Sequence, residues 1–291
     1  MATIPTPSLP FVETKLNFLP PTDAKPFVLV DPAANPSLPR TNFEEEWVPA
    51  RVYNARPLLE QGSADEKPTL DREGFTLEPH NTHVKDFYDD AHVQEHYYPE
   101  VIELVKAITG ASDVQVFDHT VRAPKEKGRR EAVHRVHNDY TVKSGPQRVK
   151  DLTSDPEKLA TRLNNRFAFI NVWRSISASP VEELPLAVSD ARTIKREDFV
   201  ATDLVYSDRT GEVYSVRHQP DQQYYYFPHM HKNEALLLKV YDSVDDGETA
   251  RFVAHTAFRD PTSPADPKPR ESIEVRTIAF FAPSSPTIEH Q

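Results

Sequence analysis

The chain contains no cysteine among its 291 residues. This absence excludes disulfide bonds, thiolate nucleophiles and thiolate-rich zinc or iron–sulfur sites. Any metal bound by this protein must therefore use histidine, aspartate, glutamate or water as ligands. Glycine is also scarce, with 7 glycines against 27 prolines. Glycine-rich phosphate-binding loops are missing, which disfavours nucleotide-binding folds.

Positive charge and long apolar runs are scarce as well. The net charge is −11, and no basic stretch interleaved with aromatic residues is present, so we expect neither nucleic acid nor a membrane surface as a partner. No segment is apolar enough to span a bilayer, and the N-terminus does not resemble a cleaved leader. We therefore expect a cytoplasmic protein with a small-molecule substrate, and leave a homodimer open.

The order of segments predicts a mainly β protein. Residues 1–45 are rich in proline and lack periodicity, which indicates an extended arm, whereas residues 46–291 are predicted to form a single domain. Helices are predicted over about 84–108 and 156–164. After residue 165, eight short strand-like segments follow without intervening helices, which predicts a double-sheet sandwich or barrel with a few flanking helices.

Two histidines and one aspartate form a candidate metal site. His137 and Asp139 are two residues apart in a strand-like segment, so their side chains project the same way. His255 lies in the strand-like segment RFVAHTAF, flanked by small residues. Two histidines and one carboxylate hold the metal of non-haem iron(II) oxygenases and leave positions for cosubstrate and oxygen. We predict that these three residues bind one metal and form the catalytic centre.

Other histidines offer rival ligand sets. His134 is three residues before His137, which suits a helix, but the surrounding alternation is strand-like and would turn His134 away. His229 and His231 share a face and suit a two-histidine cupin-type site, or else lie in a loop at a pocket rim.

The last strand carries an unusual polar face. Alternation places Arg270, Ser272, Glu274 and Arg276 on one side. Arginine binds carboxylates through two parallel hydrogen bonds and stays charged when half-buried. We predict that Arg270, with Arg276 assisting, anchors the distal carboxylate of a cosubstrate such as 2-oxoglutarate. The alternative is that these arginines pair with Glu271 or Glu274.

Aromatic residues and isolated arginines are candidate substrate contacts, because rings form pocket walls and arginines bind acidic groups. They favour a small, partly apolar molecule with a polar or acidic handle. The candidates are Tyr140, Trp173, Arg174, Arg192, Tyr224 and Tyr226.

Several blocks in one order resemble a known family: HNDYT, NVWRSI, PLAVSDARTI, YYYFPHMHKNEALLLKVYDS, HTAFRDP and PRESIEVRTIAFF. Over about residues 45–282 the chain is similar to fungal and bacterial oxygenases that include the fungal gibberellin desaturase, the aspergillic acid hydroxylase/desaturase and a protein of cephamycin 7α-methoxylation. The resemblance implies a double-stranded β-helix (jelly roll) and the cofactors Fe(II), 2-oxoglutarate and O2. It also implies that His137, Asp139 and His255 are the metal ligands, and that Arg270, Ser272 and Arg276 bind the cosubstrate.

These inferences predict an Fe(II)/2-oxoglutarate-dependent dioxygenase that hydroxylates, desaturates or cyclises a small secondary metabolite through removal of hydrogen from a C–H bond. Two alternatives remain. One is a cupin-like metalloenzyme that does not use 2-oxoglutarate, and the other is a metal-free barrel that binds a small molecule.

Overall fold

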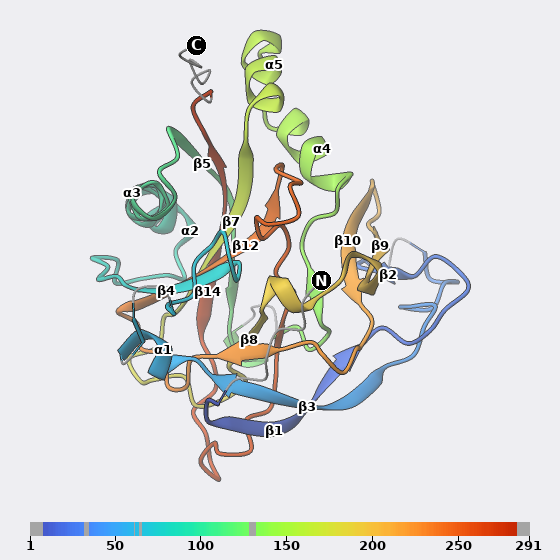
Figure 1. Cartoon of the computed structure of the whole chain (residues 1–291), viewed down its shortest axis with the longest axis vertical. Coiled ribbons are helices and arrows are strands. Elements are labelled where there is room, and N and C mark those ends of the chain that lie inside the picture. The colour runs from blue at the N-terminus through green and yellow to red at the C-terminus, as the bar shows by residue number, and fades with distance from the viewer. Residues whose placement is uncertain (1–7, 32–34, 61, 64–65, 128–131, 284–291) are drawn as a thin grey trace, which may run out of the picture.

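Two curled sheets face each other in the computed structural model, which describes residues 8–31, 35–60, 62–63, 66–127 and 132–283 (Figure 1). Within these residues the larger sheet has nine strands, in the order β1 (Phe11–Phe18), β3 (Glu46–Asn54), β11 (Tyr224–Tyr226), β8 (Leu186–Ser189), β13 (His255–Ala257), β6 (His137–Asn138), β10 (Thr210–Val216), β9 (Phe199–Val205) and β2 (Phe27–Leu29). The smaller sheet of the described chain has five, in the order β4 (Phe75–Pro79), β12 (Glu234–Asp242), β7 (Phe167–Ser175), β14 (Ser272–Phe280) and β5 (Asp113–Arg122).

The architecture is jelly-roll-like, which confirms the prediction of a mainly β fold. Each of the eight strand-like segments predicted after residue 165 contains a strand, β7 to β14. The β9–β10 hairpin closes at the pair Thr210 and Val205.

Alternation along β7 divides the interior into two apolar layers. Phe167, Phe169 and Trp173 point between the sheets and pack with side chains such as Tyr225 and Val253 of the larger sheet side. The intervening residues Ala168, Ile170 and Val172 point the other way, into a cluster with α3. The smaller sheet is therefore buried on both faces, and its inner face lines the space between the sheets.

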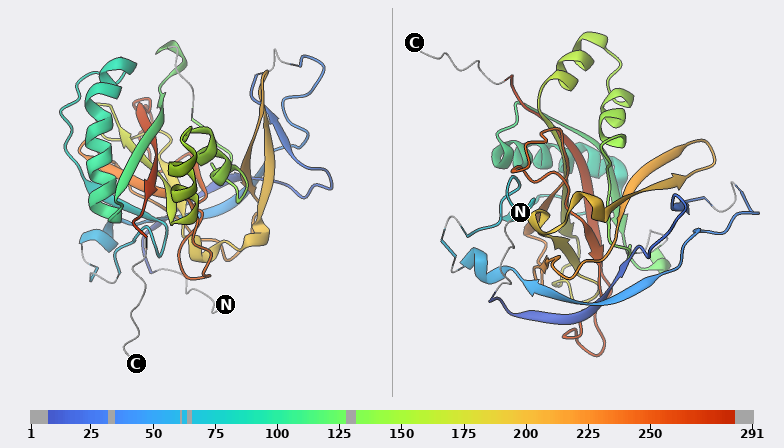
Figure 2. Two further views of the ribbon diagram at one scale, coloured as in Figure 1. Left: turned by 90° about the horizontal axis from the view of Figure 1, so that it is seen from above. Right: turned by 45° about the vertical axis from the view of Figure 1, so that its right-hand side comes forward.

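Helices cover the outside of the smaller sheet and one end of the molecule (Figure 2). The described chain contains α1 (Arg56–Glu60), α2 (Asp90–His92), the π-helical turn η2 (Val93–Tyr97), α3 (Tyr98–Thr109), α4 (Ser144–Asp151), α5 (Pro156–Asn164) and the 3₁₀ turns η3 (Lys125–Lys127), η4 (Ala191–Thr193) and η5 (Arg196–Asp198). Among the described helices none combines the length and apolar character required to cross a membrane.

The helix predicted from residue 84 begins later, at Asp90. The carboxylate of Asp89 accepts hydrogen bonds from the backbone N–H groups of Ala91 and His92, which fixes the start of the helix there. The preceding segment is not helical, and its Val84 and Phe87 are buried in the cluster beneath α3. By contrast, the helix predicted over 156–164 has those bounds and is capped by Asp155.

The arm predicted for residues 1–45 supplies two strands. Within its described residues it has no helix. β1 pairs along its whole length with β3, and β2 pairs in parallel with β9 at the opposite edge. Residues 1–7 and 32–34 lie outside the described residues. The boundary between arm and domain at residue 45 stays a prediction.

Candidate functional site

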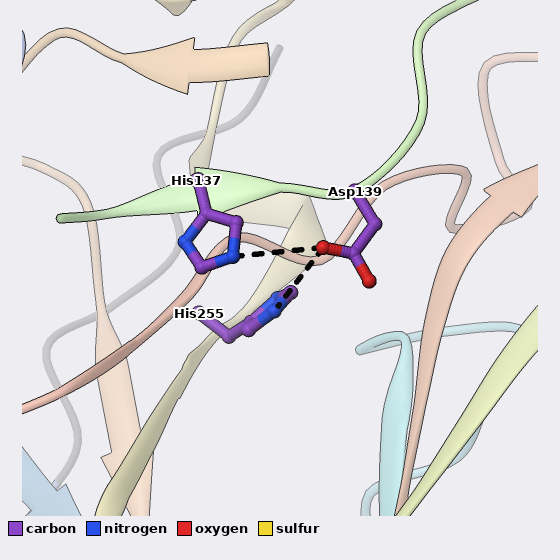
Figure 3. A group of neighbouring side chains, drawn as sticks. All are labelled: His137, Asp139 and His255. Carbon is purple, nitrogen blue, oxygen red and sulfur yellow. Dashed lines mark ion pairs between the residues drawn. The ribbon is translucent and has the colours of Figure 1, made fainter. Parts of the chain in front are cut away.

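The side chains of His137, Asp139 and His255 converge between the sheets (Figure 3). His137 Nε2 lies 3.5 Å from Asp139 Oδ1, and His255 Nε2 lies 3.9 Å from the same oxygen. One ligand atom from each residue lies within 4.8 Å of the others. Metal–ligand distances near 2 Å allow one ion to touch atoms about 4 Å apart, so this donor set fits a single metal ion.

Strand pairing brings these residues together from distant parts of the sequence. The short strand β6 lies between β10 and β13, and its residue His137 stands directly opposite His255. The register therefore aligns the two imidazoles, whose centroids are 4.4 Å apart. Asp139 follows β6 by one residue and turns its carboxylate toward both rings.

Both imidazoles are oriented by backbone carbonyls. His137 Nδ1 lies 2.8 Å from the Arg135 oxygen, and His255 Nδ1 lies 3.2 Å from the Val253 oxygen. With the proton on Nδ1, each ring donates to its carbonyl and presents the lone pair of Nε2 to the site. This tautomer is the one that a metal ligand requires.

Electrostatics keep Asp139 and His255 in forms that can bind a metal. Burial raises the pKa of Asp139, but the hydrogen bond from His137 and the charge of Arg276 outweigh burial and hold that pKa well below its ordinary value. Burial, helped by the neighbouring His137, lowers the pKa of His255. An ionised carboxylate and a neutral imidazole are the forms that bind metal.

Arg270 is buried close to the triad, and within the part of the chain that the structure describes it has no carboxylate partner. Its Nη1 donates to the Leu184 carbonyl at 2.6 Å, and its guanidinium lies 5.8 Å from the centroid of Trp173. Among the described residues no carboxylate oxygen lies within 4.0 Å of this guanidinium. Burial, together with the charge of Arg122, lowers its pKa to about 10. A buried cation of this kind is favourably placed to receive an anion.

Arg276 has a different environment. Its guanidinium lies 2.8 Å from Glu274, 3.1 Å from Asp118 and 3.5 Å from Asp139. Burial lowers its pKa, but the charges of Glu274, Asp139 and Asp118 outweigh burial and raise it. The ion pairing with Glu274 that the sequence left open as an alternative is therefore present at Arg276, and Arg270 carries no such pair within the described chain.

A cavity of about 50 Å³ joins the triad to Arg270. Its walls come from both sheets, and they are Arg122, Val133, His137, Asp139, Trp173, Leu186, His255, Thr256, Ala257, Arg270, Glu274 and Arg276. Ser272 is buried and shares the strand face of Arg270, opposite Arg122 in register. Larger hollows exist elsewhere, but among the described residues only this cavity contains the three converging ligands.

Two of the six predicted substrate contacts lie at this site. Trp173 forms part of the cavity wall. Tyr140 follows Asp139 and stacks on Phe169 with ring centroids 4.2 Å apart. Burial, followed by the charge of Asp139, raises the pKa of Tyr140.

The other four lie elsewhere. Arg174 points away from Trp173, across β7, where it donates to the His80 carbonyl at 2.6 Å. Arg192 pairs with Asp190 at 2.7 Å and lines a separate cleft of about 350 Å³. Tyr224 and Tyr226 pack into the apolar cluster on the outer face of the larger sheet. None of the four lines the cavity beside the triad. Arg174, Tyr224 and Tyr226 lie on strand faces turned away from it. Arg192 lies in η4, where ion pairs with Asp190 and Glu73 hold its side chain.

The rival histidines are likewise placed elsewhere. His134 faces the ring of Trp47, with centroids 6.3 Å apart, and does not join the triad. His229 and His231 lie in the loop between β11 and β12.

Two residues at the site escaped the sequence analysis. Asn171 is fully buried and donates to Asp139 Oδ2 at 2.7 Å. Arg122 lines the cavity near Arg270. A signal existed for Asn171, since it is the single polar residue in the run from Phe167 to Trp173.

Comparison with known proteins identifies relatives over most of the chain. Residues 16–280 match the family model described as "Oxidoreductase/YMDC permease-like domain". The chain is 31% identical to the hydroxylase/desaturase efuI of Hormonema carpetanum, covering 79% of this chain and 85% of the relative. It is also 31% identical to the Fe(II)/2-oxoglutarate-dependent dioxygenase nvfI of Aspergillus novofumigatus, covering 84% and 87%.

A solved structure supports the same relationship. The iron and alpha-ketoglutarate-dependent endoperoxidase NvfI superimposes with a TM-score of 0.82 at 28% sequence identity, covering 94% of this chain and 98% of that chain. The predicted jelly-roll fold is thereby confirmed.

Proposed function

This chain belongs to the family of fungal Fe(II)- and 2-oxoglutarate-dependent oxygenases, and we propose that His137, Asp139 and His255 hold its iron. The observation that carries this proposal is the convergence of two imidazole nitrogens and one carboxylate oxygen on one point. The named relatives favour this activity over a cupin-like enzyme without 2-oxoglutarate and over a metal-free barrel.

The iron, once bound with 2-oxoglutarate and O2, supplies an oxidant that removes hydrogen from an unreactive C–H bond. The protein contributes geometry. The hydrogen bonds of the two Nδ1 atoms to backbone carbonyls direct each Nε2 toward the site, and Asp139 presents Oδ1 there. These three residues would hold the iron and leave the remaining ligand positions to cosubstrate and oxygen.

Arg270 is proposed as the main anchor of the distal carboxylate of 2-oxoglutarate, with Ser272 and Arg276 assisting. Its guanidinium is buried and has no carboxylate partner in the described chain, whereas that of Arg276 already has three. Trp173 lines this cavity beside Arg270.

The proposed substrate is a small, partly apolar secondary metabolite. Trp173, which lines the cavity, and Tyr140, which follows Asp139 in the chain, are proposed to contact this substrate. Hydroxylation would give alcohol, succinate and CO2 from substrate, 2-oxoglutarate and O2. Desaturation or cyclisation would remove a second hydrogen and release water in place of the alcohol oxygen, with the same succinate and CO2. We further propose a single domain over residues 46–291 with residues 1–45 as an arm, and a cytoplasmic protein without a nucleic-acid partner. The proposal leaves the homodimer open.

The test is to load the protein with Fe(II) under anaerobic conditions, add 2-oxoglutarate and O2, and follow succinate by mass spectrometry. Extracts of small metabolites are then screened for products shifted by about +16 or −2 mass units, the changes expected for hydroxylation and desaturation. Succinate formation that depends on both iron and 2-oxoglutarate is the expected result. Turnover without 2-oxoglutarate, or consumption of peptides and oligonucleotides alone, would overturn the proposal.

A further inference from the structure

Asn171 occupies a place in β7 where an apolar side chain would be expected. It lies between Phe169 and Trp173 on the inner face of the strand, and it is fully buried. Burying an amide among apolar groups costs free energy unless its polar atoms are hydrogen-bonded. We therefore expect Asn171 to have a hydrogen-bond partner that offsets the cost of burying its amide.

That partner is the carboxylate of the proposed metal ligand Asp139. Asn171 Nδ2 donates to Asp139 Oδ2 at 2.7 Å. The other oxygen, Oδ1, is the one that faces His137 Nε2 and His255 Nε2. The two carboxylate oxygens thus differ in their surroundings. Oδ1 faces the proposed metal position, and Oδ2 accepts a hydrogen bond from Asn171.

Arg276 and Glu274 complete a polar cluster with Asp139 and Asn171, behind the Asp139 carboxylate. Arg276 stands directly opposite Asn171 on β14 and approaches the same oxygen, with Nε 3.5 Å from Asp139 Oδ2. Glu274 holds Arg276 through a 2.8 Å ion pair and lies 3.4 Å from Asn171 Nδ2. This polar cluster joins the segment after β6 in the larger sheet to strands β7 and β14 of the smaller sheet.

We propose that Asn171 is a positioning residue that makes Asp139 a one-oxygen metal ligand, with the Glu274–Arg276 pair as its support. A carboxylate whose Oδ2 is held by an amide cannot easily swing that oxygen onto the metal. Binding through both oxygens would occupy a coordination position that cosubstrate or oxygen requires. This inference rests on the proposed function, since it assumes that the triad binds iron.

The test compares Asn171→Ala with the matched control Thr277→Val in the full chain. Thr277 is also fully buried, and its hydroxyl donates to the Ile170 carbonyl at 2.7 Å rather than to a side chain of the polar cluster. The dissociation constant for Fe(II) is measured anaerobically, and Co(II) is used as a spectroscopic probe of coordination. Loss of a partner that orients a ligand typically weakens metal affinity about 10- to 100-fold.

We expect Asn171→Ala to weaken Fe(II) binding by that factor and to change the visible bands of the Co(II) protein, because the freed Oδ2 enters the coordination sphere. Thr277→Val is expected to leave both readouts as in the wild type. Asn171→Val, whose branched side chain suits a strand, should behave as Asn171→Ala and guards against loss of folding in the alanine variant.

Different outcomes would contradict the role of Asn171 and the metal site itself. Wild-type iron affinity and an unchanged Co(II) spectrum in both Asn171 variants, together with loss of metal in His255→Ala, would overturn the role of Asn171 alone. Full metal binding by His255→Ala would overturn the proposed metal site itself.

Discussion

His137 and His255 stand directly opposite each other on neighbouring antiparallel strands, with ring centroids 4.4 Å apart. This cross-strand pair joins two distant parts of the sequence at the candidate metal site. Because side chains alternate along a strand, a register slip by one residue would turn one imidazole to the opposite face of the sheet. The chemistry proposed for this protein therefore depends on the register of two very short strands.

The first prediction concerns the metal ligands. Replacement of His137, Asp139 or His255 by alanine should remove most iron affinity and leave the fold, because a three-ligand site loses both a donor and its geometry. Iron content after anaerobic loading and gel filtration measures the effect. The control is His134→Ala, which should retain iron because His134 faces Trp47. Normal iron content in His255→Ala would refute the assignment.

The second prediction separates the two arginines. Arg270→Ala should raise the apparent KM for 2-oxoglutarate by roughly 30- to 150-fold, which corresponds to about 2 to 3 kcal/mol of lost charge-assisted binding. Arg276→Ala should raise it less, because Arg276 is already paired with Glu274 and Asp139. Initial rates of succinate formation supply the measurement. The opposite order would exchange the two roles, and no effect in either variant would remove the cosubstrate site from this strand.

Much of the fold and part of the site follow from local sequence patterns. Alternation places Ser272, Glu274 and Arg276 on one face of β14, and Ile273 with Val275 in the apolar layer on the other. Arg270 lies two residues before the start of this strand and lines the same cavity as Glu274 and Arg276. The spacing of His137 and Asp139 likewise predicts that their side chains share a direction. These features depend only on neighbouring residues.

Contacts between distant segments are less accessible to sequence reasoning. Arg174 and Trp173 are adjacent in sequence, yet alternation sends Trp173 to the cavity and Arg174 to the opposite face, beside His80. Arg174 is predicted from the sequence to contact substrate because it is an isolated arginine. Its place on the strand face opposite to Trp173 instead brings it to His80. The partnership of Asn171 with Asp139 depends on how the two sheets are packed, which no local pattern specifies.

The third prediction concerns acid stability. Burial lowers the pKa of His80, His134 and His218 below its ordinary value. The unfolded chain therefore binds more protons than the folded one as pH falls through the ordinary histidine range near 6.5, so the free energy of unfolding should fall with pH in that window. Urea midpoints of the metal-free protein at about pH 7.5 and 5.5 measure this slope.

A variant can assign part of that slope to one residue. His218 packs edge-on against Phe18 at 5.0 Å, so His218→Phe should preserve packing and reduce the pH dependence. The exposed His83 supplies a control, in which His83→Gln removes a histidine from the surface. An equal slope in His218→Phe and wild type would show that this histidine contributes nothing to acid destabilisation.

The last prediction uses the two tryptophans of the chain as reporters. Trp173 is 2% exposed and lies 5.8 Å from the Arg270 guanidinium, whereas Trp47 is 43% exposed and lies near His134. A carboxylate that binds Arg270 offsets the positive charge over the Trp173 ring and should change its fluorescence. Anaerobic titration of the iron-loaded protein with 2-oxoglutarate should therefore give a saturable fluorescence change.

The change should persist in Trp47→Phe and disappear in Trp173→Phe, which keeps an aromatic ring in the cavity wall. Arg270→Ala should shift the titration to higher 2-oxoglutarate concentration by the same factor as its KM, because one guanidinium governs both measurements. A response that survives in Trp173→Phe and is lost in Trp47→Phe would place the cosubstrate away from Arg270. That outcome would require another anion site, even if the triad still bound iron.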